Sequence, residues 1–161
     1  MPFQKKVNIN QAPAVEGDFA SINPRAAVLA GEGGLVAGED GVTIARFAWV
    51  DEDGISVSNA GAGTPDGFAS RAANRAYIQM ILDKSTMVVN RGLPIILHNE
   101  GDFFGRFAAG ATKGQKVFAS NTDGSVSAAE AGATVAGCTE TKFKVENTCA
   151  AGELAKISTW G

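Results

Sequence analysis

The sequence has few side chains that could do chemistry, and the first is its single histidine. His98 follows the apolar run 94–97 and lies four residues before Asp102. A histidine beside a carboxylate can act as the base of a hydrolytic triad, but no serine stands in a Gly-x-Ser-x-Gly elbow that would mark a nucleophile. We interpret His98 as a surface or hydrogen-bonded residue at a strand end, and we expect no catalytic residues and no enzyme activity.

The next candidates are the acidic run 51–53 and the two cysteines, as ligands for calcium or zinc. An EF-hand loop places Asp or Asn at its first, third and fifth positions and glycine at its sixth. Here Gly54 arrives at the fourth position and Ile55 fills the fifth. Two cysteines and one distant histidine do not make a zinc set. We expect a solvated hairpin turn at 51–54, no metal site and no cofactor.

A glycine-rich stretch, GAGTPDGFASR at 61–71, resembles a phosphate-binding loop at first sight. Counted from Gly61 on the Walker pattern, Asp66 stands where the second glycine belongs and Gly67 stands where the lysine belongs. Pro65 lacks an N–H donor, and the charge of Asp66 would repel a phosphate. Pro-Asp-Gly is a turn sequence, so we predict a turn and no nucleotide site.

Composition predicts one soluble, glycine-rich domain. The 161 residues are 45% hydrophobic and 19% charged, with 20 glycines and a net charge of −3. A chain of this length buries about two-thirds of its unfolded surface, so it needs no disulfides to fold. No basic block exists beyond Lys5-Lys6, which argues against a nucleic-acid partner. No apolar run is long enough for a membrane span or a signal peptide, so we expect synthesis in the cytoplasm.

Hydrophobic periodicity predicts a mainly β fold. About eight to ten short alternating segments are separated by turn signals every eight to twelve residues, which is typical of a barrel or sandwich. One helix is expected at 70–84, where small and apolar residues recur at three and four positions. We predict a single-domain β-barrel or jelly-roll-like sandwich at 25–161. An extended N-terminal arm at 1–24 precedes it, because its three prolines exclude a long helix.

Cys138 and Cys149 flank the segment TETKFKVENT. Phe143 and Val145 alternate in it with polar residues, which predicts a strand. An extended segment puts the two sulfurs roughly 30 Å apart, whereas a disulfide needs Cα atoms within about 7 Å. Two interpretations remain open: free thiols in a reducing cytoplasm, or an intermolecular disulfide between assembled copies.

Several segments, in order along residues 22–161, carry a resemblance to a family. They are INPRAAVLAGEGGLVAGEDGVTIARFAWVD, GTPDGFASR, STMVVNRGLPIILHNEGDFF, GQKVFASNTDGSVSAA and AGELAKISTWG. Together they resemble the structural cement (capsid decoration) proteins of tailed bacteriophages. The resemblance implies a virion protein on the outer capsid surface, made in the bacterial host cytoplasm. It also implies that the protein cements neighbouring major capsid proteins as a homotrimer or homodimer and has no catalytic residues.

In such a role the N-terminal arm is expected to reach a capsid protein or another subunit, with Phe3, Val7 and Ile9 as apolar anchors. The alternative is that the arm adds a strand to its own domain. A competing function is a β-sandwich binding module for a carbohydrate or receptor. An exposed Trp160 with Phe103 and Phe104 beside a groove would favour that module, whereas burial against a partner subunit would favour cement.

Overall fold

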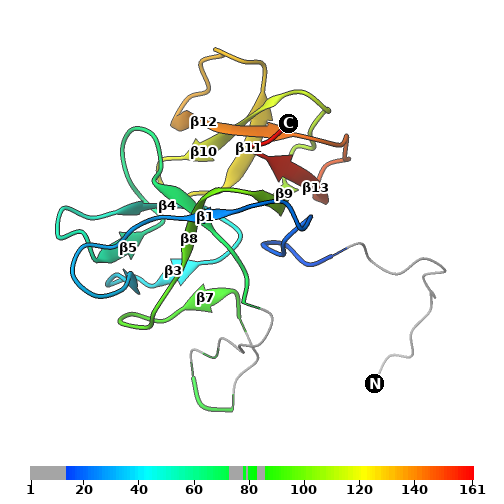
Figure 1. The fold of residues 1–161 in the computed structure, drawn as a ribbon. Helices are drawn as coiled ribbons and strands as arrows, with labels where there is room; N and C mark the ends of the chain where they lie inside the picture. The colour runs from blue at the N-terminus through cyan, green and yellow to red at the C-terminus, as the bar shows by residue number, and fades with distance from the viewer. Residues whose placement is uncertain (1–13, 73–77, 79, 83–85) are drawn as a thin grey trace.

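The computed structural model describes residues 14–72, 78, 80–82 and 86–161, and strands make up all the regular structure in them (Figure 1). The strands are β1 (Ala26–Ala27), β2 (Val36–Ala37), β3 (Val42–Thr43), β4 (Phe47–Val50), β5 (Ser56–Ser58), β6 (Gly67–Ala69), β7 (Val88–Val89), β8 (Leu97–Glu100), β9 (Asp102–Phe107), β10 (Lys116–Ser120), β11 (Val126–Ala129), β12 (Cys138–Val145) and β13 (Glu153–Ser158).

The strands form two larger open sheets and one small pair. The six-stranded sheet has the order β1-β8-β6-β4-β5-β2, the five-stranded sheet has the order β11-β10-β12-β13-β9, and β3 pairs with β7. All pairs are antiparallel except β2 with β5. The mainly β fold is therefore confirmed, and it is built from open sheets, not from a closed barrel. Most of the helix expected at 70–84 lies outside the described residues, and the described ones among them, 70–72, 78 and 80–82, are not helical.

One long bent strand joins the two sheets. β8 belongs to the six-stranded sheet and β9 to the five-stranded sheet, with only Gly101 between them (Figure 1). Gly101 has φ +138°, a conformation that side chains other than glycine rarely adopt. A Cβ there would also lie 3.0 Å from the ring of Phe103 and 3.2 Å from Cβ of Arg25. Glycine is therefore required at the bend.

An aromatic core fills the space between the sheets. Phe47 and Phe68 are cross-strand partners, so their side chains share one face of the six-stranded sheet. Their ring centroids are 5.3 Å apart, and that of Phe68 lies 5.1 Å from Phe103 of the facing sheet. Phe143 of β12 lies 5.5 Å from Phe47. Such offset and edge-to-face pairs each add about 0.5–1.5 kcal/mol beyond the area that they bury.

A second core lies under the opposite face of the six-stranded sheet. Because side chains alternate along a strand, the neighbours of the aromatic residues point the other way. Leu97, Val57 and Ala69 do so, and they pack with Val42 and Val89 of the small β3–β7 pair. The six-stranded sheet is thus covered on both faces over its centre, so any exposed apolar residue must lie toward its edges.

The loop at 61–66 is held by its neighbours in the sheet. The carboxylate of Asp66 accepts the backbone N–H of Val50 at 2.8 Å, and the indole N–H of Trp49 donates to the carbonyl of Gly63 at 3.2 Å. Trp49 is buried, as predicted for a core residue. A Cβ on Gly61 would overlap the indole ring of Trp49. Glycine at position 61 therefore lets the loop backbone pack directly against the indole ring of Trp49.

This packing predicts the effect of the smallest substitution. Gly61→Ala should lower the free energy of unfolding by about 1–3 kcal/mol, because the indole must move to admit the methyl group. Gly34→Ala is the matched control, since nothing lies within 4 Å of a Cβ at Gly34. Urea denaturation of both variants measures the difference. Equal stability of the two variants would contradict the packing argument.

Candidate functional site

Residues 15–24, here called the strap, extend the five-stranded sheet. The backbone N–H of Gly17 donates to the carbonyl of Phe104 at 2.8 Å, and the N–H of Phe104 donates to the carbonyl of Asp18 at 3.0 Å. These bonds cover the edge of β9 that does not pair with β13. Within the region expected to be an extended arm, Gly17, Asp18 and Ala20 therefore bond to β9.

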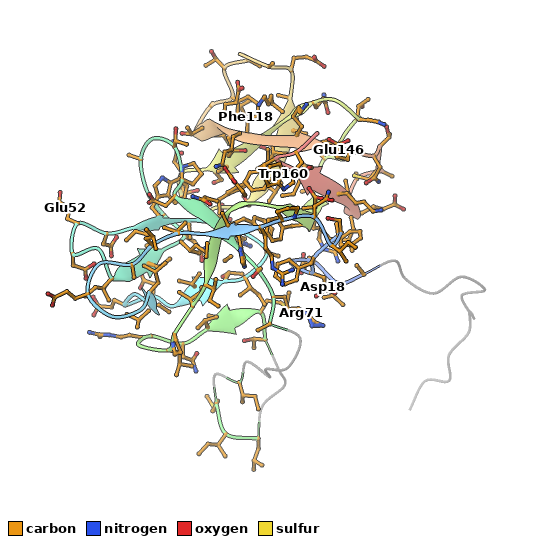
Figure 2. All side chains as sticks on the ribbon, in the orientation of Figure 1. Asp18, Glu52, Arg71, Phe118, Glu146 and Trp160 are labelled. Atoms are coloured by element: carbon orange, nitrogen blue, oxygen red, sulfur yellow. The ribbon has the colours of Figure 1, made fainter. Side chains whose placement is uncertain are left out.

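The strap also contacts the other sheet. The backbone N–H of Arg71, just beyond β6, donates to the carbonyl of Gly17 at 2.8 Å. The guanidinium of Arg71 lies 3.3 Å from the carboxylate of Asp18, and Figure 2 shows the two side chains beside each other. A second ion pair joins Arg106 to Glu16 at 2.8 Å. Exposed pairs of this kind contribute about 0–1 kcal/mol each, so the backbone bonds hold the strap.

His98 is enclosed where the strap crosses the bent strand. Its ring lies 5.5 Å from Phe19 of the strap and 5.5 Å from Phe103, and Arg25 stacks over Phe19 at 4.0 Å. Only 7% of His98 is exposed, so of the two alternatives expected for it, a surface or a hydrogen-bonded residue, the structure supports the hydrogen-bonded one. Burial lowers the pKa of His98, a hydrogen bond with the backbone of Ala26 opposes the shift, and the positive charge of Arg25 lowers the pKa further.

The lowered pKa predicts a pH dependence of stability. Below the ordinary histidine pKa of about 6.5 the unfolded chain binds a proton that the folded chain resists. The free energy of unfolding should therefore fall between pH 7 and pH 5, by at most about 1.4 kcal/mol per pH unit. His98→Gln should flatten this slope. Urea denaturation across the range measures it. An equal slope in the variant would exclude His98 as its source.

A cleft of about 300 Å³ lies between the strap and the end of the chain. At its side, the carboxylate of Asp102 accepts the hydroxyl of Ser21 at 2.5 Å and the amide of Asn23 at 2.6 Å. Burial alone would raise the pKa of Asp102, but hydrogen bonds from Ser158, Ser21 and Asn23 hold it below its usual value. The cleft therefore carries a fixed negative charge at neutral pH.

Trp160 stands at this cleft with half of its surface exposed (Figure 2). Its indole N–H donates to the carbonyl of Pro24 at 2.8 Å, so the strap fixes the ring. Phe103 and Phe104 are both buried. The aromatic platform that would favour carbohydrate recognition is therefore not assembled, although Trp160 itself is open to a partner.

An exposed apolar patch lies at the β1 edge of the six-stranded sheet. The backbone N–H of Val28 donates to the carbonyl of Leu97 at 2.9 Å, and both side chains point into the second core. By alternation the next pair, Leu29 and Ile96, stands on the opposite face. Leu29 is 92% exposed and Ile96 is 62% exposed. We call these two residues the edge patch. Within the described ranges, no strand pairs with the outer side of β1.

The predicted contact residues Phe3, Val7 and Ile9 lie outside the described residues. Cys138 pairs with Ser120 at one end of β12, and Cys149 forms an isolated bridge with Ala111 beyond its other end. Both thiols are free and partly exposed. The strand between them is extended, as predicted, so the cysteines do not meet within the chain. A disulfide between copies stays a prediction.

In the acidic turn at 51–54, the carboxylate of Asp53 forms hydrogen bonds with the residues that directly follow the turn. Asp53 accepts the hydroxyl of Ser56 at 2.6 Å and the backbone N–H groups of Ile55 and Ser56. These hydrogen bonds lower the pKa of Asp53, and the bond from the Ser56 hydroxyl has the largest effect. In the described part of the chain, no three His, Cys, Asp or Glu side chains gather as a metal ion would need. No helix in those residues is long and apolar enough to cross a membrane.

Sequence reasoning missed the residues that form these features. The roles of Asp18, Arg71, Leu29 and Ile96 depend on which strands meet. Alternation at 28–29 and 96–97 was the only local signal for the edge patch, and it does not show which face stays uncovered.

The described residues thus form an open β fold with an exposed apolar patch at one sheet edge. The model of the XM1 gp53 minor capsid protein family matches residues 3–159, and the chain belongs to this family. It is therefore a component of the virion capsid and not an enzyme, which confirms both expectations. A chain from the capsid of Myoviridae phage XM1 has the same fold, with a TM-score of 0.63 at 20% identity over 99% of this chain and 98% of that chain. Comparison with the curated proteins gave no match.

Proposed function

We propose that this minor capsid protein binds the outer surface of the shell and cements neighbouring major capsid proteins. The edge patch is the observation that carries the proposal. Leu29 and Ile96 are large apolar side chains that stand exposed beside a strand edge. Exposed apolar groups next to an open edge are typical of a surface that pairs with another chain.

Energetics support this assignment. Full burial of a leucine or isoleucine side chain stabilises by about 1.5–3 kcal/mol. A partner strand on β1 would add backbone hydrogen bonds to the apolar contact. A standard interface buries about 800 Å² per partner, so the edge patch is the centre of a larger contact and not the whole of it.

Oligomer formation would multiply such contacts. As a homotrimer or homodimer, the protein would hold several capsid subunits at once, and linked contacts raise avidity by about 10²–10⁴-fold. We assign the N-terminal arm to a contact with a capsid protein or a second subunit through Phe3, Val7 and Ile9. The strap supports this role, because it ties the base of the arm to both sheets.

Substitution in the edge patch tests the contact. Ile96→Ser should weaken binding to undecorated capsids about tenfold or more. The lost apolar burial should cost at least about 1.4 kcal/mol of binding free energy, and this amount corresponds to a tenfold change in affinity. Ile81→Ser is the matched control, because Ile81 is 89% exposed at a different site. Cosedimentation with capsids measures both. Equal affinity of the two variants would remove the edge patch from the interface.

The thiols provide a separate test of assembly. If Cys138 or Cys149 of one subunit reaches a cysteine of another, particles released from the cell should contain disulfide-linked subunits. Non-reducing electrophoresis of particles should then show ladders that collapse to monomer with a reductant. Monomer alone without reductant would exclude the disulfide and leave the capsid role untouched.

A further inference from the structure

The two halves of the strap are held in different ways. Up to Asp18 its backbone bonds to both sheets, at Phe104 and at Arg71. Beyond Asp18 the N–H of Ala20 donates to the carbonyl of Asp102 at 2.9 Å. The other contacts of residues 19–24 include the ring of Phe19 on His98, the bonds from Ser21 and Asn23 to Asp102, and the bond from Trp160 to Pro24. Residues 19–24, here called the latch, therefore depend mainly on side-chain contacts.

His98 lies beneath the latch and has one unused ring nitrogen. Its Nδ1 is buried and, among the described residues, has no hydrogen-bond partner. The hydrogen bond with the backbone of Ala26 therefore belongs to Nε2. A neutral ring fits this arrangement, because Nδ1 then carries no proton. A proton on Nδ1 would place a charged donor in an enclosed space without an acceptor, which is costly.

The charges around His98 also oppose its protonation. Arg25 follows the latch and stacks over Phe19, and its positive charge is the one that acts on the pKa of His98. β1 and β6, which pair with β8 on either side of His98, carry no ionisable side chain. The carboxylates on the surrounding elements have other partners: Asp18 pairs with Arg71, Glu100 with Lys142, and Asp102 with Ser21 and Asn23, while Arg106 of β9 pairs with Glu16.

We propose that protonation of His98 releases the latch from the domain while both sheets stay folded. Release exposes the ring to water, which hydrates the charge and accepts a hydrogen bond from Nδ1. The polar groups of the latch can bond to water in the same way. Release also removes the partner of the Trp160 indole N–H and uncovers part of the β9 edge. The strap is thus an acid-sensitive cover over the bent strand, and the proposed capsid contact is not needed for this inference.

The pH range follows from the two states of the latch. In the released state the pKa of His98 is the ordinary value of about 6.5, and in the closed state burial lowers it. Release therefore takes up a proton below about pH 6.5, and the ratio of released to closed latch rises by up to about tenfold per pH unit. Asp102 adds nothing between pH 5 and pH 7, because its pKa is below the usual value of about 3.9 in the closed state.

Residue-resolved amide hydrogen exchange of the folded full chain at pH 5, 6 and 7 tests the proposal. The amide of Ala20 reports opening of the latch, and that of Ile157, buried in β13 between two neighbouring strands, reports opening of the whole domain. At each pH the protection factor of Ala20 should be lower than that of Ile157. Between pH 7 and pH 5 it should fall about tenfold, because release takes up one proton.

Substitutions assign the pH dependence to His98. His98→Gln keeps a donor for the Ala26 backbone but takes up no proton, so it should remove the pH dependence at Ala20. Arg25→Gln removes the repelling charge and should reduce the pH dependence, which provides the test if His98→Gln does not fold. Arg71→Gln is the matched control. It removes the ion pair with Asp18 in the first half of the strap and should change the protection of Ala20 by the same factor at every pH.

Three results would overturn the proposal. Equal protection of Ala20 and Ile157 would show that the latch opens only when the whole domain unfolds. Lower but pH-independent protection of Ala20 would show that His98 does not control the latch. A pH dependence that is undiminished in His98→Gln, or in Arg25→Gln, would assign the proton to another group. None of these measurements involves a capsid, so failure here is distinguishable from failure of the cement role.

Discussion

The bend at Gly101 is the constraint on which the rest of the molecule depends. It lets one strand serve both sheets, because β8 ends and β9 begins on either side of a single residue. The positive φ and the close approach of Phe103 leave room for glycine alone. The contact between Phe68 and Phe103 then packs the two sheets against each other across the bend.

The functional features follow from this long strand. β1 pairs with β8, and the strap pairs with β9, so the segment from residue 17 to residue 28 runs beside the bent strand through both sheets. The edge patch lies where this segment leaves the six-stranded sheet. His98 and the cleft at Trp160 lie beneath or beside the strap.

The sequence predicted local structure well where a short period or a turn decides it. The predicted turn at 51–54 joins β4 to β5 as a hairpin, and the alternation at Phe143 and Val145 lies in β12. The sequence could not decide whether His98 is a surface or a buried hydrogen-bonded residue, because Phe19, about 80 residues away, covers it. Neither a helical period nor a strand period could show that Leu29 and Ile96 stay uncovered. That outcome depends on how far the facing sheet extends, which is a property of the whole fold.

The central claim is that this chain is a structural subunit that binds an assembled shell. The most direct measurement is the binding of the purified protein to empty, expanded capsids that lack it, followed by quantification of the bound copies at saturation. The account predicts saturation at a fixed ratio of this chain to the major capsid protein, with bound copies visible on the outer surface by electron microscopy. No binding, or binding without a defined ratio, would contradict it.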